Sequence, residues 1–152
     1  MIEKFAPWLA GIAVVFGLGF VSWCLALIGG WRRLAEIYST REPADGKVYS
    51  MQSAVVGQVH YRSCLTIALL PVGLRLAMWP MFLPLGHPTL LIPWSDFHGI
   101  RKRRSFFMKL DEVTIGNPPV ATLCFRPHIL SAAREIGYLK EEAESREQAV
   151  PK

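Results

Sequence analysis

The chain has 152 residues, 51% of them hydrophobic, and a formal net charge of +5. This length leaves room for one compact domain and an anchor but excludes a multidomain architecture. The three cysteines and four histidines lack the C-x-x-C and H-x-x-x-H spacings of disulfide frameworks and zinc sites. No Gly-rich phosphate-binding motif is present either. We therefore expect no metal and no cofactor, and we expect the histidines at surfaces or turns.

The hydrophobic residues are concentrated at the N-terminal end. From Phe5 to Trp31 the chain carries no charge, and this run exceeds the roughly 20 apolar residues that a spanning helix needs. It is also longer than the apolar core of a signal peptide, which has about 7–15 residues. Residues 1–31 are therefore predicted to be an uncleaved transmembrane anchor.

The flanks of this run predict how it sits in a bilayer. Trp8 and Trp31 would lie about 35 Å apart along a helix, close to the separation of the two interfacial belts that Trp prefers. Lys4 is the one basic residue before the run, whereas Arg32 and Arg33 follow it at once. We assign Trp8, Trp31, Arg32 and Arg33 to the membrane interface. The positive-inside rule then places the N-terminus outside and the following domain in the cytoplasm.

Two small-x-x-x-small pairs lie within the run, Ala13 with Gly17 and Ser22 with Ala26. Such pairs let a neighbouring helix approach closely. Small residues are also common in spanning helices, so both interpretations stay open.

Residues 32–46 are predicted to be a juxtamembrane helix and linker. One helical face is apolar, because its residues recur at i, i+3, i+4 and i+7: Trp31, Leu34, Ala35 and Tyr38. This face either lies on the membrane surface or packs on the domain that follows. Pro43 and the pair at 45–46 end the helix.

Short β-branched segments dominate from Tyr49 onward. Residues 53–70 predict one or two strands, and the turn at 71–73 predicts a hairpin with 74–79. Further strands are expected at 90–92, 96–104, 106–116 and 120–127. The chain then predicts a C-terminal amphipathic helix that covers the sheet, with one apolar face: Ile129, Ala132, Ala133, Ile136 and Leu139.

The stretch Leu90–Phe97 brings Ser95 and Asp96 near His98. These are the residue types of a hydrolase triad, but triad members converge from separate loops, whereas neighbours in an extended segment alternate between faces. We interpret Pro93 as a bend or bulge at a sheet edge and Trp94 as a core side chain at that bend. No catalytic residue is expected.

Three segments are similar to those of membrane-anchored bacterial proteins with a PH-like domain: "GW..LA..Y" at Gly30–Tyr38, "GL.L" at Gly73–Leu76, and "HPTLLIPW" at the start of His87–Phe97. The resemblance implies an α+β fold. An N-terminal transmembrane helix would precede a PH-like bent antiparallel β-sheet, a partly open barrel capped by the C-terminal helix. The PH-like domain would cover 47–142, and 143–152 would be a charged, disordered tail. The resemblance also implies a bacterial inner membrane.

A basic segment with aromatic neighbours lies between two predicted strands. It contains Arg101, Lys102, Arg103, Arg104, Phe106 and Lys109. Such a segment suits an anionic membrane surface or a partner protein. The alternative is a solvated hairpin tip with Phe106 or Phe107 in the core.

These features predict a non-enzymatic, single-pass protein whose PH-like domain is an interaction or scaffold module. It would be an accessory subunit or assembly factor of a membrane-protein complex, with the lipid bilayer and a membrane protein as partners. Nucleic acid is not an expected partner, because no recognised nucleic-acid motif accompanies the basic patch. The alternative function is an anionic-lipid sensor that uses segment 101–109.

Overall fold

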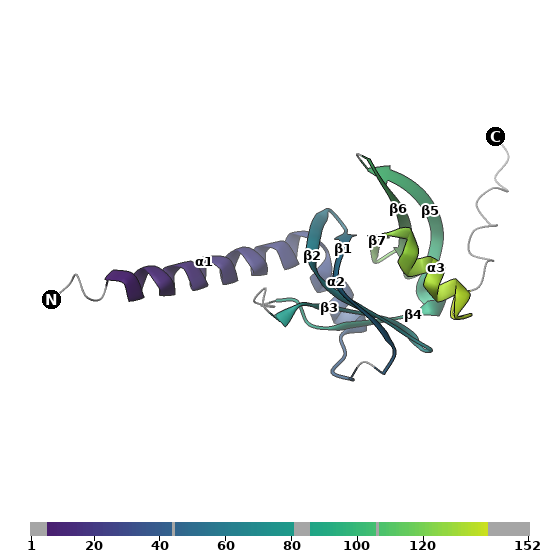
Figure 1. The fold of residues 1–152 in the computed structure, drawn as a ribbon, viewed down its shortest axis with the longest axis horizontal. Helices are drawn as coiled ribbons and strands as arrows, with labels where there is room; N and C mark the ends of the chain where they lie inside the picture. The colour runs from purple at the N-terminus through teal and green to yellow at the C-terminus, as the bar shows by residue number, and fades with distance from the viewer. Residues whose placement is uncertain (1–5, 44, 81–85, 106, 140–152) are drawn as a thin grey trace.

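The computed structural model describes residues 6–43, 45–80, 86–105 and 107–139, and it confirms the α+β class. Helix α1 (Ala6–Ile28) projects from a β-sheet domain that also carries α2 (Trp31–Tyr38) and α3 (Pro127–Glu135) (Figure 1). The predicted tail, 143–152, lies outside the described residues, as do residues 81–85 of the proline-rich segment 80–88.

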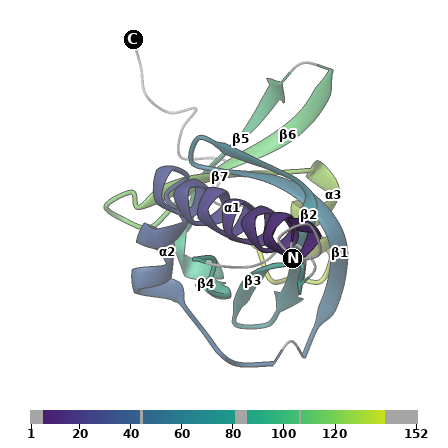
Figure 2. The ribbon, with the colours of Figure 1, turned by 90° about the vertical axis from the view of Figure 1, so that its left-hand side faces the viewer.

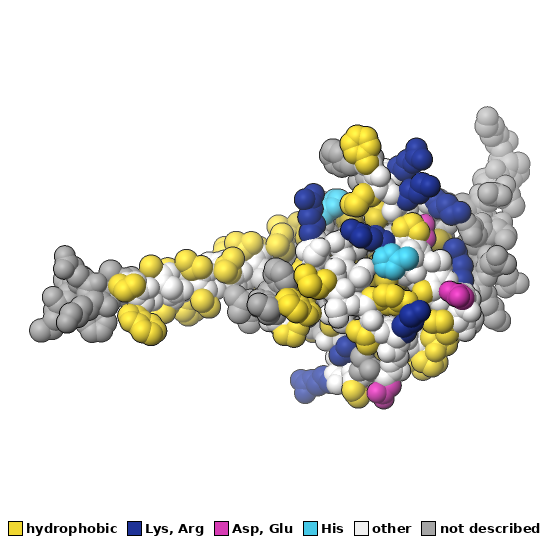
Figure 3. All heavy atoms as spheres, in the orientation of Figure 1, with side chains coloured by type: hydrophobic (Ala, Val, Ile, Leu, Met, Phe, Trp, Pro, Cys, Tyr) yellow, Lys and Arg dark blue, Asp and Glu magenta, His cyan; other side chains and the backbone are white. Residues whose placement is uncertain are grey.

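Helix α1 is, among the described residues, the one helix long and apolar enough to cross a bilayer. Its 23 residues extend about 35 Å at 1.5 Å per residue, against roughly 30 Å for the hydrocarbon core. Side chains along its length are exposed, from Trp8 through Phe16 to Ile28. Figure 3 shows these apolar side chains along α1 and basic side chains gathered on the domain. The contrast fits a membrane anchor joined to a water-exposed domain.

Seven antiparallel strands form one open sheet in the order β4-β3-β2-β1-β7-β6-β5. Strands β4 and β5 are its edges. The bounds are β1 Lys47–Val56, β2 Val59–Leu70, β3 Gly73–Met78, β4 Leu90–Pro93, β5 Phe97–Ser105, β6 Met108–Ile115 and β7 Ala121–Phe125. The predicted β2–β3 hairpin is confirmed, with Leu70 opposite Gly73. A short 3₁₀ turn, Trp94–Asp96, links β4 to β5.

The sheet is joined in its middle by a short stretch of pairing. Strand β1 pairs with β7 through Ala54–Val56 alone, opposite Leu123–Phe125. Register shifts interrupt β1 before Ala54, and Met51 there has a φ of 53°. Bulges of this kind bend a strand and increase its twist. The sheet therefore divides into a β1–β4 half and a β5–β7 half. The two halves turn away from one another on either side of the β1–β7 pairing (Figure 2, viewed along α1).

Helices α2 and α3 cover the core of the domain. The apolar face predicted for α2 is confirmed, and it packs on the domain, since Trp31, Leu34 and Tyr38 are all buried. Helix α3 buries Ile129, Leu130, Ala132 and Ala133. Its predicted face is wrong at one position. The helix ends at Glu135, and Ile136, in the turn that follows, is exposed.

Candidate functional site

Two glycines allow the end of α1 to pack closely against the domain. A Cβ atom on Gly57, in the β1–β2 turn, would collide with the carbonyl oxygen of Gly29. A Cβ atom on Gly29 would in turn meet the Val59 side chain. This close approach needs glycine on both sides. Helix α1 therefore joins the domain without a flexible linker.

Trp31 is the central side chain of this junction. It is fully buried, and its indole Nε1 donates a hydrogen bond to the Pro88 carbonyl oxygen at 3.0 Å. Its ring packs against Tyr61 and His87, with centroids 5.4 and 5.0 Å away. The expectation that Trp31 faces the membrane interface is wrong, because the domain encloses the whole side chain.

His87 joins α1 to the sheet. Its ring is buried, with Nε2 2.9 Å from the Tyr61 hydroxyl and Nδ1 3.3 Å from the Ser22 hydroxyl. Burial raises the pKa of Tyr61 above its ordinary value, so this phenol stays neutral. The surface position predicted for His87 is wrong, because its side chain is buried. Ser22 and Ala26, one of the small-residue pairs, face this domain, since Ser22 bonds His87 and Ala26 is buried.

Pro93 and Trp94 lie at the corner between β4 and β5. Pro93 ends the edge strand β4, opposite Gly73. Trp94 is half-buried, and its Nε1 donates to the Leu70 carbonyl oxygen at 2.8 Å. Its ring packs against Phe97 at 5.0 Å and stacks on Tyr138 at 6.2 Å. The side chain thus closes the edge of the core rather than filling its centre.

Asp96 ties this corner to α2. The Tyr38 hydroxyl donates a 2.6 Å hydrogen bond to Asp96 Oδ2. Burial, this hydrogen bond and the Asp96 charge raise the pKa of Tyr38 to about 12. Ser95 donates to Asp96 Oδ1 at 3.3 Å, whereas His98 is exposed at the start of β5. This arrangement fixes α2 to the sheet.

The basic segment forms the β5–β6 hairpin, which extends beyond the rest of the sheet (Figure 1). Arg103 pairs with Glu112 at 2.7 Å, and this hydrogen bond raises the pKa of Arg103. Phe107, at the tip, is fully exposed. Phe106 lies outside the described residues. The exposed side chains of the segment are Arg101, Lys102, Arg103, Arg104 and Lys109.

The other residues predicted to lie at a membrane interface are near the two ends of α1. Trp8 is 75% exposed near the start of α1. Arg32 and Arg33 are exposed on the first turn of α2, and Arg32 lies 3.9 Å from Glu36.

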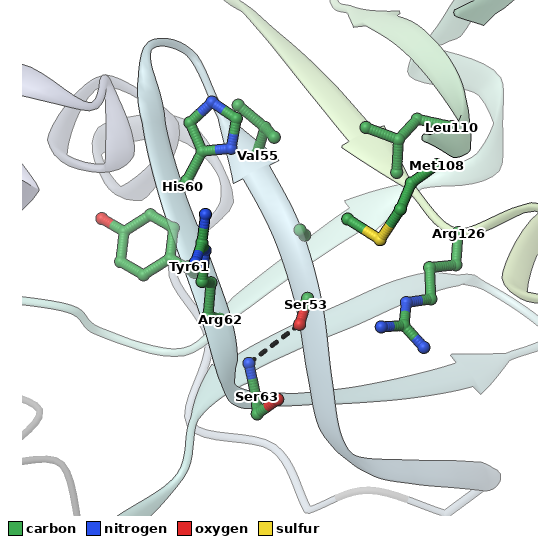
Figure 4. A pocket seen from close by; sticks show the side chains of 10 residues that line it. Ser53, Val55, His60, Tyr61, Arg62, Ser63, Met108, Leu110 and Arg126 are labelled. Carbon is green, nitrogen blue, oxygen red and sulfur yellow. Dashed lines mark hydrogen bonds between the residues drawn. The ribbon is translucent and has the colours of Figure 1, made fainter. Parts of the chain in front are cut away.

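A groove separates the two halves of the sheet (Figure 4). Its volume is about 590 Å³. His60 and Arg62 project from β2, whereas Arg126 extends toward them from the β7–α3 connection. Met108 and Leu110 line the β6 side. The groove therefore offers cationic and apolar contacts together. Within the described part of the chain, no three His, Cys, Asp or Glu side chains gather as metal ligands.

Sequence reasoning missed this groove and the His87 junction. The residues of the groove come from 53–63, 108–110 and 126, and each segment alone is an ordinary alternating strand or loop. For His87, the one available signal was its position in the "HPTLLIPW" segment. That pattern does not reveal which helix faces the ring.

Trp94 allows packing and hydrogen bonding to be measured separately. We expect Trp94→Ala to lower the free energy of unfolding by about 3 kcal/mol, at the low end for buried aromatic truncations because the ring is half-exposed. Trp94→Phe retains the ring contacts and should cost about 1 kcal/mol for the lost hydrogen bond. Chemical denaturation of the full chain in detergent measures both. Ser95→Ala is the control and should change stability by less than about 0.5 kcal/mol.

The Tyr38–Asp96 pair predicts a specific loss of stability in alkali. The pKa of Tyr38 is raised from 10.0 to about 12 in the folded chain. The contribution of the neutral phenol to the free energy of unfolding is therefore complete below pH 10 and is lost as the pH rises through 12. Asp96→Asn removes the charge but not the burial, so the pKa of Tyr38 should fall and still exceed 10. Tyrosinate absorbance, taken as the difference from the Tyr38→Phe protein, measures this pKa. An unchanged value in Asp96→Asn would contradict the assigned role of the carboxylate.

Comparison with known proteins assigns the chain to no family. No protein-family model, no curated protein and no solved structure matches it. The fold and the candidate surfaces therefore stand on the residues and contacts described above.

Proposed function

We propose that this chain is a single-pass membrane protein whose domain, PH-like in architecture, is an interaction module for a membrane-protein complex. The observation that carries the proposal is the junction of Ser22, Trp31, Tyr61 and His87. Because these side chains pack α1 against the sheet, the domain is held in one orientation relative to the span. A scaffold needs this property in order to present a surface to a partner in the same membrane.

The charges beside the span support a cytoplasmic domain. Arg32 and Arg33 follow α1 directly, and Arg41 and Lys47 come soon after. Basic residues close to a span favour the cytoplasmic side. In a bacterial cell this topology corresponds to the inner membrane, with the N-terminus outside.

The partner-facing part of the span is its domain-free half. Gly11 and Gly17 have open space beside them, and Phe16 is 74% exposed. The Ala13–Gly17 pair therefore remains available to another helix, whereas the Ser22–Ala26 pair contacts the chain's own domain. Small residues at such positions let two helices approach closely.

Site-specific photo-crosslinking in native membranes tests the interaction. A photoreactive residue at Phe16 should yield a discrete adduct with one membrane polypeptide, because that face is open. The matched position is Val72, on the β2–β3 turn away from α1, which is also exposed and should not capture the same polypeptide. Recovery of only uncrosslinked chain and lipid adducts from Phe16 would refute the helix contact.

A second candidate function is sensing of anionic lipid by the β5–β6 hairpin. The exposed Phe107 beside Arg104 and Lys109 favours it. The apolar side chain would enter the headgroup region while the basic side chains contact lipid phosphates. Each Lys or Arg near the surface contributes about 1 kcal/mol to membrane binding.

An environment-sensitive dye at the hairpin tip tests this candidate. The dye is attached to Phe107→Cys in a Cys24→Ala background, and the full chain is placed in nanodiscs. We expect a blue shift when phosphatidylglycerol is included, and its loss in high salt, which shortens electrostatic range. A dye on Val72→Cys should show no shift. Equal emission from Phe107→Cys with and without anionic lipid would rule out the sensor.

A further inference from the structure

The residues of the groove reach the membrane helix on the other side of β2. A second hollow, of about 210 Å³, lies between α1 and β2. It is lined on α1 by Leu18, Val21 and Leu25, and on β2 by His60 and Arg62. Since His60 and Arg62 also line the larger groove, the two hollows adjoin along one short segment of β2.

The charges of this segment favour an anion. His60, Arg62 and Arg126 line the larger groove, and none of the described residues that line it is acidic. All three side chains are exposed at its mouth. A guanidinium group binds phosphate oxygens in a fork of two hydrogen bonds. The groove therefore complements a phosphate group.

The α1 side of the segment favours a hydrocarbon chain. Leu18 and Val21 are 56% and 54% exposed on α1, where a spanning helix meets lipid. A soluble anion would occupy the groove and make no contact with this apolar strip. A ligand that joins a phosphate to an acyl chain covers both. The aliphatic stem of Arg62 can lie along the same apolar surface while its charge remains in a polar environment.

We propose that an anionic glycerophospholipid binds where β2 crosses α1. Its phosphate contacts Arg62 and His60, its headgroup faces Arg126 in the larger groove, and one acyl chain lies along Leu18 and Val21. This site shares no residue with the basic segment or Phe107 at the β5–β6 tip, and it does not depend on a protein partner. The lipid would fill the hollow between α1 and β2.

The experiment uses the full chain in nanodiscs of phosphatidylcholine with a minor share of phosphatidylglycerol. Each lipid is supplied in turn as an analogue with a photoreactive acyl chain. We expect the phosphatidylglycerol analogue to label α1 peptides around Leu18–Leu25 several-fold more than the phosphatidylcholine analogue. Equal labelling by the two analogues overturns the proposal, and this comparison requires no variant.

Variants then locate the phosphate. Arg62→Gln should reduce labelling by phosphatidylglycerol about fivefold, the loss expected for one basic side chain at an anionic surface. Arg62→Lys, which keeps the charge, should retain most of it. The matched control is Arg33→Gln, because Arg33 is an exposed basic residue next to the span that lines neither hollow. If Arg33→Gln reduces labelling as far as Arg62→Gln, general surface charge explains the result and the site is refuted.

A competition arm separates lipid from free phosphate. Excess glycerol phosphate in solution should leave the labelling of α1 unchanged, since it lacks the acyl chain that contacts Leu18 and Val21. Displacement of the lipid analogue by glycerol phosphate would show that the groove binds the soluble anion and would overturn the assignment to a membrane lipid.

Discussion

A buried imidazole is the constraint on which the arrangement of this protein depends. His87 lies between the Ser22 hydroxyl of α1 and the Tyr61 hydroxyl of β2, and its ring makes a T-shaped contact with that of Trp31. Buried polar groups require hydrogen-bond partners, and each one left without a partner costs about 1–3 kcal/mol. Moving α1 away would remove the Ser22 hydroxyl from His87. Helix α1 and the sheet domain therefore behave as one folded unit.

Local patterns in the sequence were sufficient to predict most of the secondary structure. The helix at Trp31–Tyr38 followed from the spacing of its apolar residues, and the β2–β3 hairpin from the Pro-Val-Gly turn between two apolar runs. Both depend on contacts between near neighbours in the chain. The end of α3 was less predictable, because Ile136 continues the apolar spacing while Gly137, with a φ of 85°, lies in the turn that follows the helix.

Contacts distant in the sequence could not be predicted. Trp31 has the composition and position of an interfacial anchor, and only the fold shows that Pro88 accepts its hydrogen bond. The basic hairpin was visible as a charge run, but the ion pair of Arg103 with Glu112 depends on strand register. The groove is harder still to predict, because Arg62 and Arg126 are distant in the sequence and line one groove only in the folded sheet. A run of charges in the sequence lies in one strand, whereas the groove is lined by residues from several segments of the chain.

The tight approach of Gly29 to Gly57 has a consequence for the behaviour of the chain in membranes of different thickness. A spanning helix adapts to a thinner bilayer by tilting. Where a flexible linker follows the helix, the tilt ends at the membrane surface. Here the β1–β2 turn contacts the end of α1 directly, so the whole sheet rotates with it. A small change of tilt would swing the β5–β6 tip through a wide arc, and bilayer thickness would thereby set how close Phe107 comes to the lipid surface.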